Sequence, residues 1–353
     1  MLARRPSLSL LLVAASLVAA GACAPTEATA PPPAVAAAAA PPVLLPGAGT
    51  PRALPSPVPF VSLEGPLWVA AGPYLLFSDV VEKNAAGAVI YRFDPVYRRF
   101  SIFPYPAAES PGPTSTNGLA VDAAGDLVAC ERYNGRLVRV SPEGKRTVLA
   151  DAWPPSAAGH AGLPLNAPND LVLRADGNIY FTDTDWGARP GTPHPPMAVY
   201  RISPAGVLTL VLAMQKPNGI ALSPDGGTLY IGSDTQAKVW KLPLDPSGAV
   251  AAGAGAGGGV AAPTVLIDGA RVPGGFKVPD GICIDDAGDL YIANNSDEIK
   301  AIEVFDAAGE PLGRIPLPAA PSNCTFGGAD RRTLYVTTLH AVYEVRVPVP
   351  GLP

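Results

Sequence analysis

One pattern recurs six times along this chain of 353 residues. In each copy a polar residue precedes a short apolar run, a turn rich in Gly and Asp, and a second apolar run, as in "KPNGIALSPDGGTLYIG" at 216–232. The six polar residues, here called the anchors, are Glu64, Asn117, Asn169, Asn218, Asp280 and Asn323. A repeat of roughly 50 residues that cannot bury its apolar faces alone must pack against further copies of itself.

The repeat predicts β-strands. Short apolar runs bounded by Gly, Asp and Pro are typical of paired antiparallel strands, and helical spacing is not sustained. Six further runs each resemble the third strand of a four-stranded unit, at 88–95, 135–144, 198–206, 238–248, 302–309 and 341–347. We therefore predict an all-β fold, a six-bladed β-propeller with four antiparallel strands per blade, over residues 58–349.

The N-terminal region has the pattern of an export signal. Arg4 and Arg5 precede an uncharged apolar stretch that is closed by small residues, which predicts a signal peptide over 1–23. "AGAC" resembles a bacterial lipobox with Cys23 as the lipidated residue, and ordinary cleavage after Ala22 is the alternative. The protein is thus expected to be exported from a bacterium, either periplasmic or attached to a membrane through Cys23.

Two segments are low in complexity. Residues 24–57 consist mainly of Ala and Pro, which predicts a disordered linker outside the fold. The Gly/Ala stretch at 249–262 predicts a flexible surface loop.

Composition limits the partners. The net charge is −5 and no run of Lys and Arg occurs, so nothing favours nucleic acid binding. We expect a monomer that acts on a small molecule. Beyond Cys23 the chain has Cys130, Cys283 and Cys324, and their odd number and wide spacing favour buried free thiols. A bridge between two of them is the alternative in an oxidising compartment.

Rotation about a propeller axis would bring equivalent positions of all blades together. The six anchors would then meet at the mouth of the central channel and offer only carboxylate and amide oxygens. Two carboxylates, Glu64 and Asp280, with several amide oxygens suit a hard divalent cation, above all Ca²⁺. The alternative is that each Asn or Asp only caps a turn, as these residues commonly do before Gly. Sixfold recurrence favours the shared site.

Several segments together resemble one known family. They are "EGPLW", "LNAPNDLVLRADGNIYFTDTDWG", "KPNGIALSPDGGTLYI", "VPDGICIDDAGDLYIA" and "SNCTFGGADRRTLYVT". They are similar to the gluconolactonase / senescence marker protein / luciferin-regenerating enzyme family of six-bladed propellers, over about 60–347. The resemblance implies calcium in the central channel and hydrolysis of lactones or, in some branches, of organophosphates.

The resemblance also implies residue roles. Glu64, Asn169, Asn218 and Asp280 would hold the metal, and Asp280 would be the catalytic general base. Asn117 would face the substrate or the metal. Ser115 stands where sugar-lactone members have an arginine, so specificity for aldonolactones does not follow.

Two further residues are substrate-binding candidates, Glu131 of "CERYNGR" and Trp186. For Glu131 an ion pair at the end of a strand is the alternative. His160 and His194 lie in Pro/Gly-rich loops expected at the pocket rim. The sequence thus favours an exported calcium-dependent lactone or ester hydrolase, with other divalent cations open. The alternatives are a phosphotriesterase on the same metal site and a non-catalytic binding propeller.

Overall fold

The structure is a computed structural model, and it describes residues 43–56, 58–80, 89–106, 115–153, 162–186, 196–253 and 259–352. The chain divides into two units, 1–38 and 39–353, and every described residue belongs to the second. The predicted signal segment with Cys23, the loop histidines His160 and His194, and most of the predicted linker lie outside the described residues.

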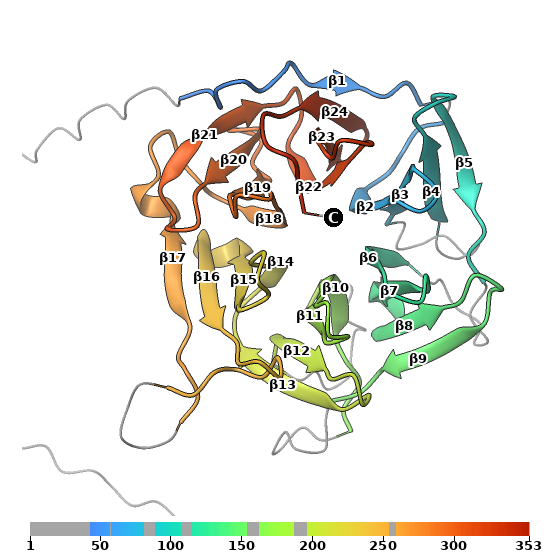
Figure 1. Ribbon diagram of the computed structural model, residues 1–353, viewed down its shortest axis with the longest axis vertical. Coiled ribbons are helices and arrows are strands. Elements are labelled where there is room, and N and C mark those ends of the chain that lie inside the picture. Colours follow the sequence, from blue (N-terminus) through green and yellow to red (C-terminus); the bar gives the residue numbers. More distant parts are fainter. Residues whose placement is uncertain are drawn as a thin grey trace, which may run out of the picture. The chain divides into compact units, whose positions relative to one another are not determined.

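Six antiparallel sheets of four strands form a ring around a central axis (Figure 1). The prediction of a six-bladed propeller is therefore confirmed. Blade 1 contains β2 (Leu63–Val69), β3 (Tyr74–Asp79), β4 (Val89–Asp94) and β5 (Arg99–Phe103), and blade 2 contains β6 (Thr116–Val121), β7 (Leu127–Glu131), β8 (Arg136–Val140) and β9 (Arg146–Ala150). Blade 3 contains β10 (Ala167–Leu173), β11 (Ile179–Thr184), β12 (Ala198–Ile202) and β13 (Leu208–Ala213), and blade 4 contains β14 (Pro217–Leu222), β15 (Thr228–Ser233), β16 (Lys238–Pro243) and β17 (Thr264–Asp268). Blade 5 contains β18 (Pro279–Ile284), β19 (Leu290–Asn294), β20 (Ala301–Phe305) and β21 (Pro311–Pro316). The sixth contains β22 (Pro321–Gly327), β23 (Thr333–Thr338), β24 (Val342–Arg346) and β1 (Arg52–Ala53).

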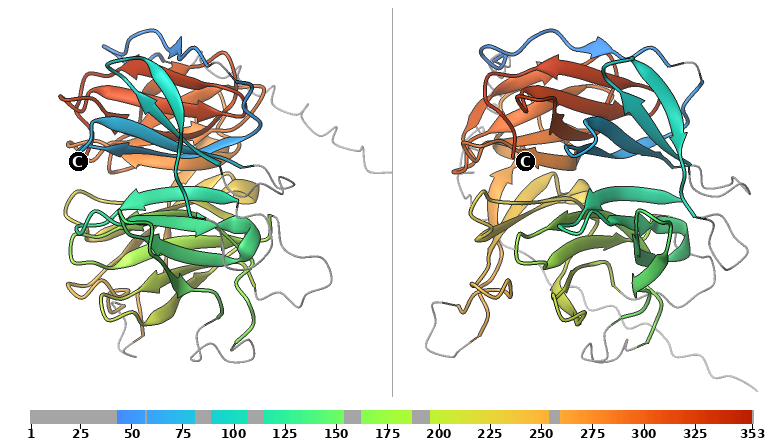
Figure 2. Two further views of the ribbon diagram at one scale, coloured as in Figure 1. Left: turned by 90° about the vertical axis from the view of Figure 1, so that its right-hand side faces the viewer. Right: turned by 45° about the vertical axis from the view of Figure 1, so that its right-hand side comes forward.

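Burial along the strands explains their composition. The innermost strand and its neighbour are covered on both faces, as in β14 and β15, where almost every residue is buried. Such strands are almost continuously apolar instead of alternating. The outer strands β5 and β13 contain only partly buried and exposed residues, because one face meets solvent. The side views in Figure 2 show the sheets stacked side by side around the ring, with the C-terminus at one face.

Many hairpin turns use one device. A carboxylate before the turn accepts hydrogen bonds from backbone N–H groups two and four residues later, and a glycine near the turn's end takes a positive φ. Asp122 accepts from Ala124 and Asp126 at 3.0 Å each, with Gly125 at φ 85°. Asp285, Asp306 and Asp245 repeat this arrangement. These are Asx turns, and they account for the similar turns "DAAGD", "DDAGD" and "DAAGE" in the sequence.

All six runs predicted as third strands are third strands in the structure, namely β4, β8, β12, β16, β20 and β24. In the part of the chain that the structure describes, the helices are three 3₁₀ turns of three residues, at Arg132–Asn134, Asp234–Gln236 and Gly269–Arg271. None of these is long enough to cross a membrane.

The predicted linker is wrong at its C-terminal end. Residues 43–56 lie on the outside of blades 5 and 6, and β1 pairs with β24 as the fourth strand of blade 6. Leu45 and Leu54 are buried, at 8% and 3% exposure. The Leu45 N–H donates to the Arg314 carbonyl at 2.9 Å. Backbone pairing and two buried leucines bind this stretch to the ring, although its overall composition resembles a spacer.

Two ion pairs meet at Glu344 of β24. Arg52 of β1 donates to Glu344 of β24 at 2.7 Å, and Arg98 reaches the same carboxylate at 3.0 Å. The described residues of the Gly/Ala stretch at 249–262 are exposed or partly buried, and isolated bridges join Leu244 to Val250 and Ala252 to Val260.

Candidate functional site

A β-bulge turns the anchors out of their sheets. In the blades 2 to 5, the pairing between the inner strand and its neighbour skips the anchor and the residue after it. In β14, for example, Pro217 and Ile220 have partners in β15 and Asn218 does not. A bulged residue is freed from the ladder, so its side chain can be re-aimed. Blades 1 and 6 have bulges just after Glu64 and just before Asn323.

Glycines after the anchors allow neighbouring inner strands to approach closely. A β-carbon on Gly219 would lie 2.1 Å from the Asp280 carbonyl oxygen, and one on Gly65 would lie 2.0 Å from that of Asn117. Hydroxyl groups then hold the anchor backbones. The Ser78 hydroxyl donates to the Asn117 carbonyl at 2.8 Å, and that of Thr182 to the Asn218 carbonyl at 2.9 Å.

Three anchor amides form a chain across blades 2, 3 and 4. Asn117 Nδ2 donates to Asn169 Oδ1 at 2.5 Å, and Asn169 Nδ2 donates to Asn218 Oδ1 at 2.5 Å. All three side chains are buried, with exposures of 3%, 5% and 3%. Three amides from strands about 50 residues apart therefore meet at one place.

The two anchor carboxylates belong to the same cluster. Asn323 Nδ2 donates to Glu64 Oε2 at 3.4 Å, and Asn295 Nδ2 donates to Asp280 Oδ2 at 2.8 Å. Burial, together with the nearby charge of Asp170, raises the pKa of Glu64 to about 7. Burial first, and then the charge of Glu64, raises the pKa of Asp280 well above its usual range. The effect of the Glu64 charge on Asp280 indicates that the two carboxylates lie near each other.

The structure adds Asp170, which the sequence analysis missed. It follows Asn169 in "APND", at the place where blades 1, 2, 4 and 5 have glycine. Asn323 Nδ2 donates to Asp170 Oδ2 at 3.5 Å, although blades 3 and 6 lie on opposite sides of the ring. Burial raises the pKa of Asp170 to about 6. The signal was present in the repeat as a departure from the anchor-Gly pair.

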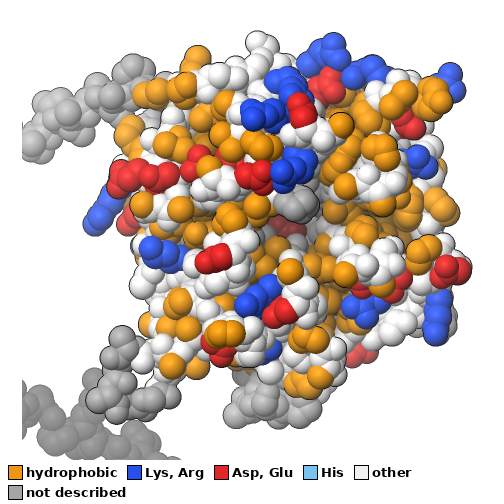
Figure 3. Space-filling model, viewed as in Figure 1, with side chains coloured by type: hydrophobic (Ala, Val, Ile, Leu, Met, Phe, Trp, Pro, Cys, Tyr) orange, Lys and Arg blue, Asp and Glu red, His pale blue; other side chains and the backbone are white. Residues whose placement is uncertain are grey.

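Asp170 and Asn323 also line a cavity beside the cluster. This cavity has a volume of about 220 Å³ and is lined by inner-strand residues of the blades and by Leu352. The face that carries the C-terminus is hollowed at the centre of the ring, and an acidic side chain is visible in the depth of the hollow (Figure 3).

The donor set fits a hard divalent cation. It consists of carboxylate and amide oxygens, and the hydrogen-bond partners of both anchor carboxylates are amides and one backbone N–H. Burial and neighbouring negative charges raise the pKa values of these carboxylates, and a bound cation would favour their ionised forms. Among the described residues no three His, Cys, Asp or Glu side chains are grouped closely enough to hold a metal ion by themselves. The amides are thus essential to the fit.

Basic and aromatic side chains lie near this cluster. The charge of Arg132 favours the ionised form of Glu64, and Arg132 Nε donates to the Trp186 carbonyl at 2.8 Å. Lys216 Nζ lies 4.9 Å from the centre of the Trp186 ring and pairs with Asp185. The predicted residue Trp186 is thus linked through Arg132 to the surroundings of Glu64.

Glu131 is engaged elsewhere. Its carboxylate is fully buried and accepts hydrogen bonds from Tyr105 at 2.8 Å, from Arg136 at 2.7 Å and from Arg146 at 3.0 Å. These contacts lower its pKa against the effect of burial. The oxygens proposed to bind substrate are occupied by an internal ion-pair network, which was the alternative for this residue.

Ser115 is buried, at 2% exposure, two residues before Asn117. Its hydroxyl has no hydrogen-bond partner among the described residues. A small side chain therefore stands beside the amide chain, at the position where the resemblance predicts an arginine in sugar-lactone members.

Known proteins are similar to this chain in sequence. The SMP-30/gluconolactonase/LRE-like region matches residues 63–340. A gluconolactonase from Zymomonas mobilis is 31% identical over 307 residues, which cover 82% of this chain and 79% of that protein. The lactonohydrolase oryL of Aspergillus oryzae is 30% identical over 207 residues, which cover 54% of this chain and 46% of that protein.

Solved structures share the fold. A gluconolactonase from Xanthomonas campestris superposes with a TM-score of 0.64 at 27% identity, over 88% of this chain and 98% of that one. Regucalcin from Agrobacterium tumefaciens, described as a calcium-binding protein, gives a TM-score of 0.66 at 20% identity, over 86% and 96%. The family match spans every anchor, and we conclude that this chain belongs to the SMP-30/gluconolactonase/LRE-like family.

Proposed function

We propose that the protein hydrolyses a lactone, with a divalent cation held by Glu64, Asn169, Asn218 and Asp280. The observation that carries the proposal is the meeting of two carboxylates and three linked amides from different blades at the axis. The relatives named gluconolactonase and lactonohydrolase support the reaction class. Calcium suits oxygen ligands of this kind.

Asp280 is the proposed general base. Asn295 holds one of its oxygens, and among the described residues no donor contacts the other, which is left available to a water molecule. A carboxylate beside the cation can accept a proton from an attacking water molecule. A bound cation would polarise the lactone carbonyl and stabilise the charge that develops on its oxygen.

The other residues orient and neutralise. The amide chain fixes the directions of the Asn169 and Asn218 oxygens, each of which keeps a second lone pair for a ligand. The water oxygen would add to the carbonyl carbon, its proton would pass to Asp280, and the ring C–O bond would break. The ring oxygen then takes up this proton from Asp280, which returns the carboxylate to its starting state, and the product is a hydroxy acid.

The test is hydrolysis of a panel of γ- and δ-lactones, followed through acid release. Asp280→Asn is expected to lose roughly 10²–10⁴-fold in kcat, because removing a general base typically costs this much. A chelator should abolish the activity and added Ca²⁺ should restore it. Asp225→Asn is the matched control, since this exposed carboxylate serves a turn and should leave the rate unchanged.

Activity that survives both the chelator and Asp280→Asn would disprove the proposal. Metal-dependent release of the leaving group from an organophosphate, without lactone turnover, would instead favour phosphotriesterase activity. Metal binding without turnover of either panel would favour a binding propeller.

A further inference from the structure

We propose that Cys283 and Cys324 form a dithiol pair that oxidises to a disulfide and joins blade 5 to blade 6. The sequence analysis left a bridge between two of the cysteines open, and the proposed lactone hydrolysis makes no use of either thiol. The proposal therefore stands independently of the proposed function.

The two sulfur atoms already face each other. Cys283 lies on β18 and Cys324 on β22, the neighbouring inner strands of blades 5 and 6, and their Sγ atoms are 2.7 Å apart. A second observation shows that the backbones are close at this level. A β-carbon on Gly281 would lie 2.6 Å from the Cα atom of Asn323, the residue before Cys324. The approach of the two strands is therefore fixed by the ring and not by the side chains alone.

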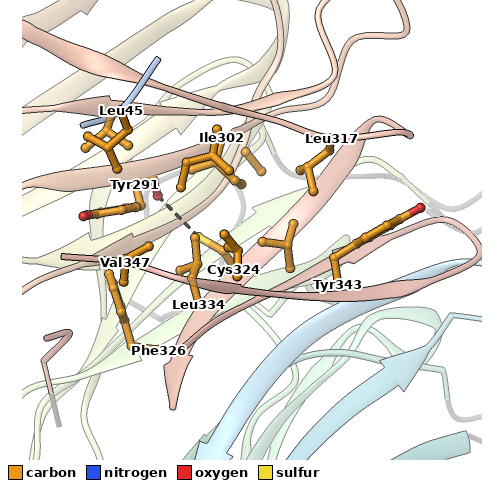
Figure 4. Packing of buried hydrophobic residues seen from close by; sticks show 14 residues of the cluster. Leu45, Tyr291, Ile302, Leu317, Cys324, Phe326, Leu334, Tyr343 and Val347 are labelled. Carbon is orange, nitrogen blue, oxygen red and sulfur yellow. Dashed lines mark hydrogen bonds between the residues drawn. The ribbon is translucent and has the colours of Figure 1, made fainter. Parts of the chain in front are cut away.

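The two thiols differ in access. Cys324 is 4% exposed, and its Sγ points to the Tyr291 carbonyl at 3.4 Å within the core between the two blades (Figure 4). Cys283 is only partly buried, and both thiols line the cavity of about 220 Å³ that opens beyond Asp170. A small oxidant can thus reach Cys283 first, while Cys324 is placed to react second.

The chemistry balances with a low-molecular-weight disulfide such as oxidised glutathione. The Cys283 thiolate attacks one sulfur of the oxidant, whose S–S bond breaks to release one thiolate. The Cys324 thiolate then attacks Sγ of Cys283 and expels the second. The two cysteines lose two protons and two electrons, and the oxidant becomes two thiols. Such bonds persist in oxidising compartments, which is where the predicted signal segment would deliver the protein.

The bond would connect two strands of the candidate site. β18 carries Asp280 and β22 carries Asn323, so oxidation would tie the backbones of these two anchors together. The cross-link would close a loop of about 40 residues, and closing a loop of this size removes much of the freedom of the unfolded chain.

The test uses the full chain, incubated natively with oxidised glutathione and digested without reduction. Mass spectrometry should find one cross-linked peptide that joins Cys283 to Cys324. The oxidised protein should melt roughly 5–10 °C above the reduced one. Cys130→Ala is the matched control, because this thiol is buried in another core cluster and its loss should change neither the peptide nor the shift.

Cys283→Ser and Cys324→Ser should each abolish both the cross-linked peptide and the difference in Tm. Three results would overturn the proposal. One is a wild-type protein whose two thiols stay reduced under conditions that oxidise the unfolded chain. Another is a stable mixed disulfide between Cys283 and glutathione. The third is a bridge from either residue to Cys130 or Cys23. Peptide mapping of the wild-type protein decides the matter even if a variant fails to fold.

Discussion

One added β-carbon at the ring axis is enough to force two inner strands apart. The glycines after the anchors Asn218 and Asp280 have no room for a side chain. The Asp280 backbone fills the space beside Gly219, and the Asn323 side chain and Cα fill the space beside Gly281. From the sequence, Asn-Gly and Asp-Gly suggest either turns or anchors. In the structure these glycines let neighbouring inner strands approach each other closely.

Gly219→Ala tests this role. The new methyl group would lie 2.1 Å from the Asp280 carbonyl oxygen, so β14 or β18 must shift, at a cost of about 1–3 kcal/mol in the free energy of unfolding. Gly259→Ala is the matched control, since a β-carbon there meets nothing within 4 Å. Thermal unfolding of the two variants should differ clearly. Equal melting temperatures would show that the inner strands are not in contact at Gly219.

The anchors could be predicted because a repeat fixes equivalent positions without knowledge of contacts. Asp170 was missed because it occupies a glycine position, and one departure from a pattern has no meaning until its neighbours across the ring are known. Glu131 could not be assigned for a related reason. Its partners Arg136 and Arg146 lie on β8 and β9 of the same blade, but which residues meet Glu131 depends on the register of that sheet.

Among the strands, β1 is the one that the sequence did not predict. Its two residues lie in an Ala/Pro-rich stretch with little apolar alternation, so local composition indicates a spacer. The last copy of the repeat contributes β22, β23 and β24 to blade 6, and the N-terminal segment supplies the fourth strand.

Removal of this segment should therefore destabilise the ring. A chain that begins at residue 58 loses β1, the Arg52–Glu344 ion pair and the buried Leu45 and Leu54. Burial of two leucines alone accounts for roughly 3–6 kcal/mol, and the exposed edge of β24 would invite aggregation. The reference is a chain that begins at residue 43. Thermal unfolding and light scattering compare the two chains, and equal stability would show that residues 43–57 do not stabilise the ring.

At the scale of the whole molecule, the buried carboxylates couple stability to pH and to cations. Burial raises the pKa of Glu64 to about 7, above its value in the unfolded chain. A carboxyl group of this kind stabilises the fold while it is protonated. This stabilisation is complete below the unfolded pKa of about 4.5 and is lost as the pH rises through about 7.

We expect the chelated protein to lose on the order of 1–3 kcal/mol of unfolding free energy from this group between pH 5 and pH 8. Ca²⁺ binds the ionised form, so it should raise Tm more at pH 8 than at pH 5. Glu64→Gln is the control and should weaken both effects, because its amide does not titrate. A calcium-induced rise in Tm that is the same at both pH values would contradict the coupling.

The pairing of β1 with β24 joins residues 292 positions apart, which has a consequence for how the molecule is made. During synthesis β1 must stay unpaired until β24 has emerged. A chain interrupted anywhere before residue 342 would be an open arc with two unsatisfied strand edges. Closure of the ring is therefore a late step of folding. Until it occurs, the unpaired strand edges remain accessible to chaperones and proteases.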